Sequence, residues 1–420
     1  TAARPPAKLA ASDAPELAEL LGRPLRLLVL CYELPPVGGG TGVACSQVLR
    51  LLSQRRDLQI EVISSSAARE AETFHTGNMR VNLLPVGKRQ LSFWQPDELL
   101  RWMSGAVRLA RRLSAEASFD LCHCWSGLPS GIVGWWLRDL QPYLVSLRGS
   151  DVPGYNRRLR LLDPLLLRRL ARQVWHGSAG VFAVSPTLRS MAQETAPELT
   201  IGVLPNGVDG DFFRPRHNRG RASFVFAGRL IERKGVDCLF EAVRIAAARH
   251  PDLRLTVAGD GPERRALLAL RTSLGIEAQV SMVGRLERQE LADTLGDAGV
   301  IVLPAVTDAM PNVVLEGMAA GMAVIATDTS ASSIVAGNGQ LVPPRDPGAL
   351  AAAIEGYLDD PALLAEHQRR SRELALERSW ENVALDHVQR FRRAMLARPG
   401  AVAAPPASSR LRRLRRKQLH

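Results

Sequence analysis

Short apolar runs alternate with longer amphipathic stretches along most of this chain. In the first half, runs of strand length lie at 25–31, 60–64, 83–86, 121–125, 143–147, 180–184 and 201–204. In the second half they lie at 223–227, 253–258, 280–283, 300–303 and 323–327, with helical spacing between them. Short strands that alternate with helices are typical of parallel sheets. The pattern predicts two α/β halves of doubly wound type, each beginning with a strand, a glycine-containing loop and a helix.

Composition divides the chain further. The first residues are rich in Ala and Pro, and the polar, turn-prone stretch 216–221 predicts a boundary between the two halves. We therefore expect a loose extension at 1–23, a first domain at 24–215, a second domain at 216–378, a separate helix at 379–396 and a disordered basic tail at 397–420.

The overall composition is that of a globular protein with full cores, because 46% of the residues are hydrophobic and 23% are charged. No apolar run approaches the roughly 18 residues that cross a bilayer, and the first residues show no secretory signal. Five cysteines do not indicate a disulfide framework. Cys122-His123-Cys124 has no second Cys/His pair to complete a metal site, so a buried strand end is favoured there. These features predict a reducing, cytoplasmic location.

The net charge of +12 predicts a phosphate-bearing partner. The tail at 410–417 carries six basic residues and no acid, and two further basic, apolar stretches lie at 88–112 and 157–172. Such segments suit the surface of an anionic bilayer, but they equally suit ordinary amphipathic helices and a solvated tail. No helix-turn-helix, zinc finger or aromatic ribonucleoprotein motif occurs, so nucleic acid is not an expected partner.

Candidate chemistry concentrates at 308–316, directly after an apolar strand and at the start of a helix. Asp308 and Glu316 stand with seven residues between them, and their carboxylates can accept hydrogen bonds from sugar hydroxyls. The backbone N–H groups of Asn312, Val313 and Val314 begin the helix, and a helix N-terminus suits a pyrophosphate. The alternative is an acidic loop whose Glu only favours the helix dipole.

Two other loops lead to the same edge of the second sheet. Arg229 and Lys234 follow the strand at 223–227 and can reach one pyrophosphate, Arg through a planar fork and Lys as a point charge. Gly284 and Arg285 follow the strand at 280–283, where backbone groups can hydrogen-bond the edge of a base. Together with the carboxylates, these loops predict a nucleotide-diphosphate site at the carboxyl ends of the strands.

A dinucleotide site in the first half is not favoured. Gly38 and Gly39 open a glycine-rich loop, but the Gly-x-Gly-x-x-Gly spacing fails at Val43. The strand at 60–64 also runs into serines where an acid would bind a ribose. The glycines still allow the backbone to approach a ligand closely.

In this order and spacing, the motifs resemble the family 4 (group 1) retaining glycosyltransferases. The matching stretches are 35–39, 185–188, 204–209, 228–235, 258–262 and 308–321, within residues 25 to 396. The resemblance implies an α/β protein of GT-B fold. Such a fold has two Rossmann-like doubly wound domains that face a central cleft, and a C-terminal helix that crosses back to the N-terminal domain.

The resemblance also implies roles for single residues. Glu316 matches the acid that holds the ribose hydroxyls of the donor. Asp308 stands at the first acid position, beside the donor sugar, where the family usually has the longer Glu. Arg229 and Lys234 match the pair that neutralises the donor diphosphate, and the helix start at 312–314 would add N–H donors to it.

Two loops of the first half complete the implied site. Gly38 and Gly39 match the loop that closes over the donor. Many relatives carry, where this chain has Arg148, a His that contacts the donor sugar. Arg148 cannot act as a base near neutral pH, but it can bind sugar hydroxyls or phosphate, with Asp151 positioning it. Alternatively, Arg148 is only a structural partner of Asp151.

The implied activity is that of a retaining hexosyltransferase, independent of metal and cofactor. It would move a sugar from a UDP- or GDP-sugar to a glycan or lipid-linked acceptor, in bacterial cell-surface polysaccharide or glycolipid synthesis at the inner face of the membrane. Two alternatives stay open. One is another GT-B activity, such as a sugar-nucleotide epimerase or phosphorylase, and the other is a catalytically silent subunit that binds a sugar nucleotide.

Overall fold

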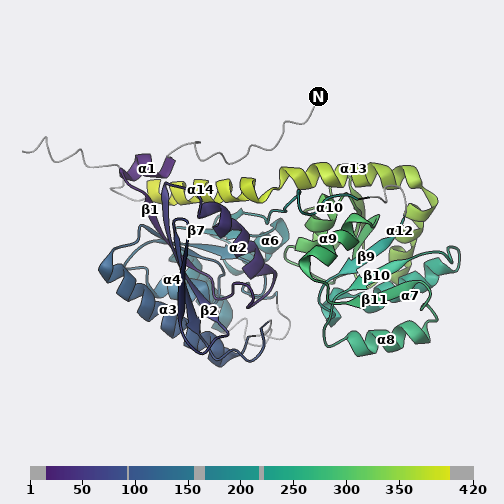
Figure 1. Ribbon diagram of the computed structural model, residues 1–420, viewed down its shortest axis with the longest axis horizontal. Coiled ribbons are helices and arrows are strands. Elements are labelled where there is room, and N and C mark those ends of the chain that lie inside the picture. The colour runs from purple at the N-terminus through teal and green to yellow at the C-terminus, as the bar shows by residue number, and fades with distance from the viewer. Residues whose placement is uncertain (1–15, 92–93, 156–165, 217–221, 398–420) are drawn as a thin grey trace, which may run out of the picture. The chain divides into compact units, whose positions relative to one another are not determined.

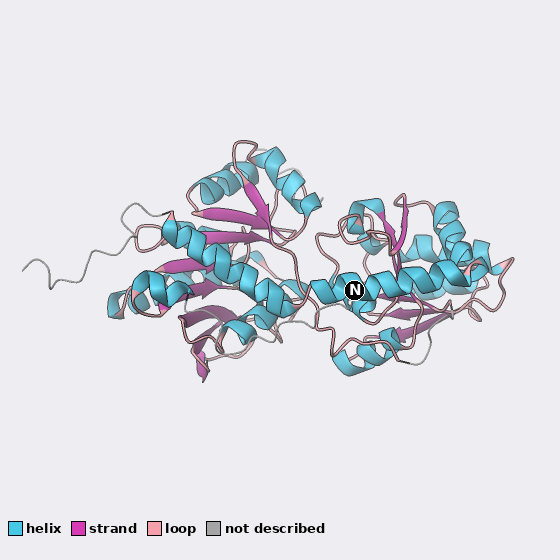
Figure 2. Ribbon diagram, turned by 90° about the horizontal axis from the view of Figure 1, so that it is seen from above, coloured by secondary structure: helices cyan, strands magenta, loops and turns pink. Residues whose placement is uncertain are grey.

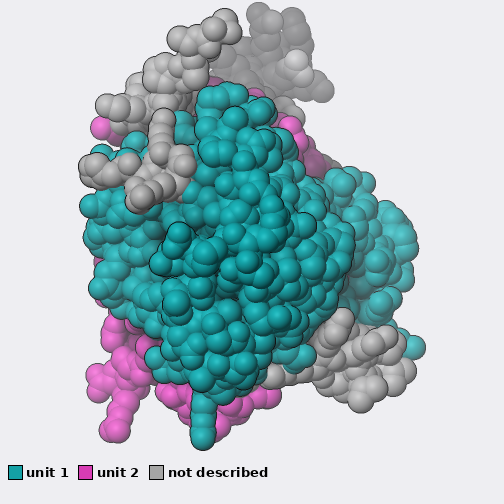
Figure 3. Space-filling model, turned by 90° about the vertical axis from the view of Figure 1, so that its right-hand side faces the viewer, with its two compact units in different colours: residues 1–8, 147–172, 182–383 teal, residues 9–146, 173–181, 384–420 magenta. Residues whose placement is uncertain are grey.

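The computed structural model describes residues 16–91, 94–155, 166–216 and 222–397. Within these ranges the chain forms two α/β sheets with helices packed on them (Figures 1 and 2). Grouped by their contacts in space, the residues form two compact units, which Figure 3 distinguishes by colour. Unit 1 holds the described parts of 147–172 and 182–383, and unit 2 holds those of 9–146, 173–181 and 384–420.

The first sheet has eight strands in the order β3-β4-β2-β1-β5-β6-β7-β8. The strands are β1 (Leu25–Leu30), β2 (Leu58–Ser66), β3 (Glu72–Thr76), β4 (Met79–Pro85), β5 (Leu121–Cys124), β6 (Tyr143–Leu147), β7 (Gly180–Ala183) and β8 (Ile201–Val203). The helices are α1 (Glu16–Leu21), α2 (Gly40–Leu52), α3 (Pro96–Glu116), α4 (Ser130–Trp136), α5 (Arg168–His176) and α6 (Pro186–Thr195). The order moves outward from β1 in both directions, which is the doubly wound arrangement that the sequence predicts.

The hairpin of β3 and β4 is the part of this sheet that the sequence did not predict. β3 pairs antiparallel with β4, whereas β4, β2, β1, β5 and β6 pair in parallel with their neighbours. β3 is exposed along its whole length, so it lacks the apolar run by which a buried strand is recognised. The strand predicted at 83–86 begins earlier, at Met79, because the hairpin extends it.

The second sheet has six strands in the order β11-β10-β9-β12-β13-β14, all paired in parallel. They are β9 (Phe224–Ala227), β10 (Leu255–Ala258), β11 (Val280–Gly284), β12 (Val300–Leu303), β13 (Ala323–Thr327) and β14 (Gly339–Val342). The helical segments are η3 (Glu232–Lys234), α7 (Val236–Ala247), α8 (Arg264–Ser273), α9 (Arg288–Gly296), α10 (Asn312–Ala319), α11 (Asp328–Ala331), α12 (Pro347–Asp359) and α13 (Pro361–Glu377). Phe224 and Phe226 pack in one core and Val225 and Ala227 in another, so β9 is covered on both faces. Burial on both faces explains why β9, β12 and β13 read as continuous apolar runs.

The last helix, α14 (Trp380–Leu396), belongs to unit 2 from Ala384 onward. His387 stacks on Trp125 with the ring centroids 5.1 Å apart, and Phe391 meets His123 edge-on at 5.5 Å. His123 lies on β5, and Trp125 directly follows that strand. These buried ring contacts hold the helix against the first sheet, as the fold class requires.

Candidate functional site

Lys234 and Asp308 form an ion pair at the carboxyl edge of the second sheet. Lys234 ends η3 after β9, and Asp308 follows β12, the neighbour of β9 in the sheet. The Lys234 Nζ lies 2.5 Å from the Asp308 Oδ2, and 11% and 12% of the two side chains are exposed. Gly235 starts α7 at a φ of 66°, so close to the Pro304 carbonyl that a side chain would collide with it. The two loops thus meet at the switch point where parallel α/β sheets bind ligands.

Glu316 lies in α10, one turn beyond the start of the helix. The residue as a whole is half-buried, yet burial of its carboxyl raises the pKa of Glu316 to about 7, and the positive charge of Arg288 opposes this shift. The Arg288 Nη2 also lies 3.6 Å from the Asp209 Oδ2, and the Arg288 Cζ lies 4.2 Å from the centre of the Phe212 ring. The sequence did not single out Arg288, because it stands at an ordinary helix start outside every motif. Glu316 can act as donor or acceptor of hydrogen bonds near neutral pH.

Arg229 and Arg285 stand on loops at the same sheet edge. Arg229 follows β9 and leads to Lys234, and Arg285 follows β11. Both are exposed, and the Arg229 side chain makes no hydrogen bond or ion pair with the described part of the chain. The Gly284 carbonyl accepts a hydrogen bond from the Gly259 N–H at 2.6 Å. Arg229 therefore presents a positive charge to an incoming anion.

Arg148 connects to the start of α10 through two amide side chains. The Arg148 Nη1 donates to the Asn206 Oδ1 at 2.9 Å, and the Asn206 Nδ2 donates to the Asn312 Oδ1 at 2.7 Å. The Asp151 Oδ1 accepts hydrogen bonds from the backbone N–H groups of Arg148 and Gly149 at 2.9 and 2.7 Å. Asp151 thus holds the turn after β6, while the guanidinium reaches toward α10. Sequence reasoning gave Asn206 no role beyond its motif, because nothing local shows that it bridges two distant segments.

The remaining predicted residues differ in their surroundings. Val313 is half-buried, and Val314 is buried with its N–H donating to the Pro311 carbonyl at 3.0 Å. Gly38 and Gly39 lie in unit 2, where Gly39 caps α2. Gly38 has a φ of 93°, its N–H donates to the Leu91 carbonyl at 2.7 Å, and a side chain there would collide with that of Glu33. Packing within unit 2 therefore requires glycine at position 38.

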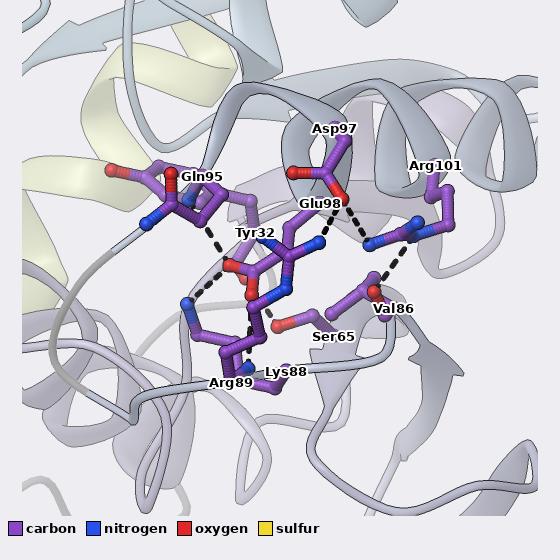
Figure 4. Close-up of polar contacts among 9 residues, drawn as sticks. All are labelled: Tyr32, Ser65, Val86, Lys88, Arg89, Gln95, Asp97, Glu98 and Arg101. Atoms are coloured by element: carbon purple, nitrogen blue, oxygen red, sulfur yellow. Dashed lines mark hydrogen bonds and ion pairs between the residues drawn. The ribbon is translucent and has the colours of Figure 1, made fainter.

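The basic stretch that begins at Lys88 is held by α3 in unit 2 (Figure 4). Glu98 accepts hydrogen bonds from the Lys88 Nζ at 2.8 Å and from the backbone N–H groups of Arg89 and Gln95 at 2.9 and 3.1 Å. Neither the Lys88 nor the Glu98 side chain is exposed, and the Lys88 Nζ lies 3.9 Å from the centre of the Trp94 ring. Lys88 therefore belongs to the interior and not to a basic surface.

Other basic residues of this stretch do face outward. Arg108, Arg111 and Arg112 on α3 are exposed. Much of the second basic stretch, at 156–165, and the tail at 398–420 lie outside the described residues. Across the described ranges, no helix combines the length and the apolar character that crossing a membrane requires.

The Cys-His-Cys segment is a buried strand end, as predicted. Cys122 and Cys124 lie on β5 with their Sγ atoms 3.9 Å apart, and burial raises the pKa of Cys122. The His123 Nε2 lies 2.8 Å from the Ser146 Oγ. Among the residues that the structure describes, no three His, Cys, Asp or Glu side chains gather as metal ligands.

Two family models match the chain. The model described as a glycosyl transferase 4-like domain matches residues 39–207, and the model described as glycosyl transferases group 1 matches residues 221–360. The second match contains Lys234, Asp308 and Glu316. The two matches together extend over most of the chain.

Two curated relatives match parts of the chain. An exopolysaccharide phosphotransferase of Streptomyces coelicolor is 32% identical over 47% of this chain and 22% of its own length. A glycogen synthase of Mycobacterium tuberculosis is 30% identical over 51% of this chain and 56% of its own length. The chain thus spans less than a quarter of the first relative and little more than half of the second.

Solved structures resemble the whole fold. Sucrose-phosphate synthase of Thermosynechococcus elongatus has a TM-score of 0.75 at 22% identity, covering 89% of this chain and 100% of that one. Anabaena HepE in complex with UDP has a TM-score of 0.69 at 17% identity, covering 87% of this chain and 99% of that one. These likenesses confirm the predicted fold. The two family models, which together match most of the chain, show that it belongs to the group 1 glycosyltransferases, and the solved structures show that it has the GT-B fold.

Proposed function

We propose that this protein is a retaining glycosyltransferase that moves a sugar from a nucleotide-diphospho-sugar to a glycan or lipid-linked acceptor. The Lys234–Asp308 pair carries the proposal, because it places a cation for a diphosphate and a carboxylate for a sugar on adjacent loops of one sheet edge. The start of α10 follows Asp308 directly and suits the same diphosphate. The structurally similar HepE in complex with UDP and with UDP-glucose supports a donor of this class.

The ion pair would exchange partners when the donor binds. In the structure, Lys234 and Asp308 satisfy each other's charge. A diphosphate is more negative than one carboxylate, so it attracts Lys234 and is neutralised by Lys234 and Arg229 together. Asp308 is then released to accept a hydrogen bond from a hydroxyl of the donor sugar. In this proposal, donor binding moves Lys234 from Asp308 to the diphosphate and leaves the Asp308 carboxylate available to the sugar.

The same cations would act on the leaving group. The acceptor oxygen forms a bond to the anomeric carbon while the bond from that carbon to the phosphate oxygen breaks. Arg229, Lys234 and the N-terminus of α10 stabilise the negative charge that develops on the departing nucleoside diphosphate. They supply the charge that a metal ion supplies elsewhere, so we propose a metal-independent reaction without a cofactor. Attack from the face of the leaving phosphate, whose oxygen takes the acceptor proton, retains the anomeric configuration.

Glu316 would hold the ribose of the donor. Two ribose hydroxyls that donate to its carboxylate favour the ionised form, which burial alone disfavours. Arg148, linked to α10 through Asn206, would bind a sugar hydroxyl or a phosphate oxygen. Gly284 and Arg285 after β11 would meet the base, and Gly38 and Gly39 would close over the donor.

The proposed cellular role rests on a basic surface that suits a membrane and on the description of one relative. The exposed Arg108, Arg111 and Arg112 of α3 suit anionic lipid headgroups, and one relative is described as an exopolysaccharide phosphotransferase. We therefore propose a cytoplasmic enzyme, peripheral on the inner face of the membrane, that acts in the synthesis of bacterial surface glycans or glycolipids.

A thermal-shift panel of UDP, GDP, ADP and their hexose conjugates tests the donor site. A ligand at about 100 times its Kd stabilises a protein by roughly 2.7 kcal/mol, so one diphosphate should raise the melting temperature clearly. Glu316→Ala should lose that shift. Glu355→Gln, on α12 in the same unit, is the matched control and should keep it, because Glu355 pairs with the exposed Arg249 away from the site.

Turnover decides between the enzyme and a silent subunit. Release of nucleoside diphosphate from the sugar nucleotide that binds, measured with and without candidate acceptors, should be detectable in the wild type and lost in Arg229→Ala. Binding without release would favour a silent sugar-nucleotide subunit, in which Lys234 never leaves Asp308. A protein that is folded and yet shifts with none of the nucleotides at millimolar concentration has no donor site, and the proposal is then wrong.

A further inference from the structure

The turn that carries Asp308 is held on both sides of the acid, in addition to the ion pair of Asp308 itself. Before it, the Arg233 Nη1 donates to the Thr307 carbonyl at 3.0 Å. After it, the backbone N–H of Ala309 lies near the Tyr155 hydroxyl, where it favours ionisation and so opposes the rise in the pKa of Tyr155 that burial causes. The Arg233 Nη1 also lies 3.5 Å from the Tyr155 hydroxyl, which connects the two holding groups. Thr307 and Asp308 therefore each contact a basic side chain, Arg233 and Lys234, and Tyr155 lies beside Arg233 and Ala309.

Tyr155 reaches the turn from a distant part of the sequence, on a segment with its own internal order. The Val152 N–H donates to the Gly149 carbonyl at 2.9 Å, and the Tyr155 N–H donates to the Val152 carbonyl at 3.2 Å. Gly149 approaches the turn so closely that a Cβ there would lie 3.1 Å from the Ala309 Cβ and 3.3 Å from the Tyr155 ring. Its φ of 135° also disfavours other residues. This order fixes the Tyr155 hydroxyl relative to the turn.

The Tyr155 hydroxyl keeps its proton, so its interaction with the turn does not change with pH near neutrality. Burial raises the pKa of Tyr155 to about 12, and the negative charge of Asp308 acts in the same direction. The hydroxyl therefore stays protonated at physiological pH and can accept the Ala309 N–H. At position 308 an Asp is shorter than a Glu by one C–C bond, about 1.5 Å, so the position of the backbone decides where its carboxylate can reach.

We propose that Tyr155 and Arg233 are positioning residues for Asp308. They hold the backbone of the turn so that the short carboxylate meets the donor sugar once Lys234 has turned to the diphosphate. The inference rests on the proposed function, since it assumes that Asp308 contacts the sugar. Neither residue is assigned to hold the nucleoside diphosphate. Their loss should therefore reduce kcat and leave the affinity for the free diphosphate almost unchanged.

The test compares the removal of two tyrosine hydroxyls in unit 1, that of the half-buried Tyr155 and that of the buried Tyr357. Tyr155→Phe removes the contact with the turn, and Tyr357→Phe, the control on α12, removes a hydroxyl that lies 2.7 Å from the His367 Nδ1. The readouts are kcat for release of nucleoside diphosphate from the active sugar nucleotide, and the Kd of the free diphosphate. We expect Tyr155→Phe to lower kcat about tenfold with the Kd changed less than twofold, and Tyr357→Phe to leave both within twofold.

A double-mutant cycle separates positioning from general loosening of the fold. In an Asp308→Ala background, Tyr155→Phe should have no further effect on kcat, because the group that it positions is gone. Arg233→Met should behave in the same way. If Tyr155→Phe matches the control, or lowers kcat equally with and without Asp308, the inference is wrong while the donor site stands. If the wild type neither binds a nucleotide nor releases one, the proposed function fails, and the inference fails with it.

Discussion

Two lysine–carboxylate pairs stand in very different surroundings. The chain contains 54 Lys+Arg but only four lysines, and both lysines among the described residues, Lys88 and Lys234, pair with an acid. The Lys88–Glu98 pair in unit 2 is completely buried, at 2.8 Å. The Lys234–Asp308 pair in unit 1 lies at 2.5 Å and keeps part of each side chain in contact with solvent.

The surroundings of the two acids explain the difference. Burial alone would raise the pKa of Glu98, but hydrogen bonds from Lys88 and from two backbone N–H groups outweigh it and hold the pKa below its usual range. That pair is closed, with Trp94 over the ammonium group, and it fastens the segment after β4 to α3. The other pair opens onto a sheet edge beside a helix start, where a stronger anion can replace the carboxylate. We therefore propose that similar chemistry is structural in one place and exchangeable in the other.

Breaking the closed pair should have the largest effect. Lys88→Met leaves Glu98 as a buried charge without its partner, and losses of this kind cost about 3–5 kcal/mol. Urea unfolding should show this loss directly. Arg89→Met is the control from the neighbouring position, since the Arg89–Asp97 pair is exposed and worth under about 1 kcal/mol. The double variant Lys88→Met/Glu98→Leu should recover much of the stability. A cost near that of the control would mean that the pair is not structural.

Breaking the open pair should affect catalysis more than stability. Lys234→Met removes a charge from the leaving group, and we expect turnover to fall by about 100-fold or more, near 2.7 kcal/mol of barrier. The free energy of unfolding should fall by only about 1–2 kcal/mol, because water can reach Asp308. Arg264→Met, which removes an exposed cation at the start of α8, should change neither. Turnover within about threefold of the wild type would remove Lys234 from the proposed mechanism.

The sequence predicts some parts of the fold and of the candidate site but not others. The strands of the second sheet other than β14 were predictable, most clearly β9, β12 and β13, because burial on both faces produces apolar runs that need no knowledge of their neighbours. Lys234 and Asp308 were predictable as companions, because each follows a strand and the carboxyl ends of parallel strands share an edge. The edge strands β3 and β14 were missed, since exposed or half-exposed strands lack that signal.

Other parts of the site depend on contacts that no local pattern reveals. Tyr155 and Asn206 approach α10 and the Asp308 turn from segments that are remote in sequence. Arg288 influences Glu316 from another helix, although its own surroundings in the sequence are ordinary. The Lys88–Glu98 pair was not predictable either. Lys88 stands in a basic stretch and was expected on the surface, but Glu98 and Trp94 surround it in the structure. Local chemistry was therefore predictable where the fold brings strand ends together, but not where single side chains bridge remote segments.

The carboxyl groups of Glu98 and Glu316 should respond to pH in opposite directions, and this is the smallest of the expected effects. The pKa of Glu98 is lowered by folding, so its contribution to stability is present above its unfolded pKa and is lost as the pH falls through the folded value. The pKa of Glu316 is raised to about 7, so the folded state binds the extra proton between about pH 4.5 and pH 7. Stability in that window therefore declines as the pH rises.

Glu316→Gln tests this sign, because the amide keeps the shape of the side chain and cannot ionise. The variant should lack the decline between about pH 4.5 and pH 7, and at pH 8 it should be more stable than the wild type, by on the order of 2 kcal/mol. It should also lose the thermal shift with the nucleoside diphosphate, because a neutral amide replaces the carboxylate that, in the proposed function, accepts the ribose hydroxyls. Urea unfolding at pH 5 and pH 8, with and without the diphosphate, measures both. A variant that is less stable at pH 8 would show that the Glu316 carboxylate is satisfied without a nucleotide, and that Arg288, rather than a ligand, is its partner.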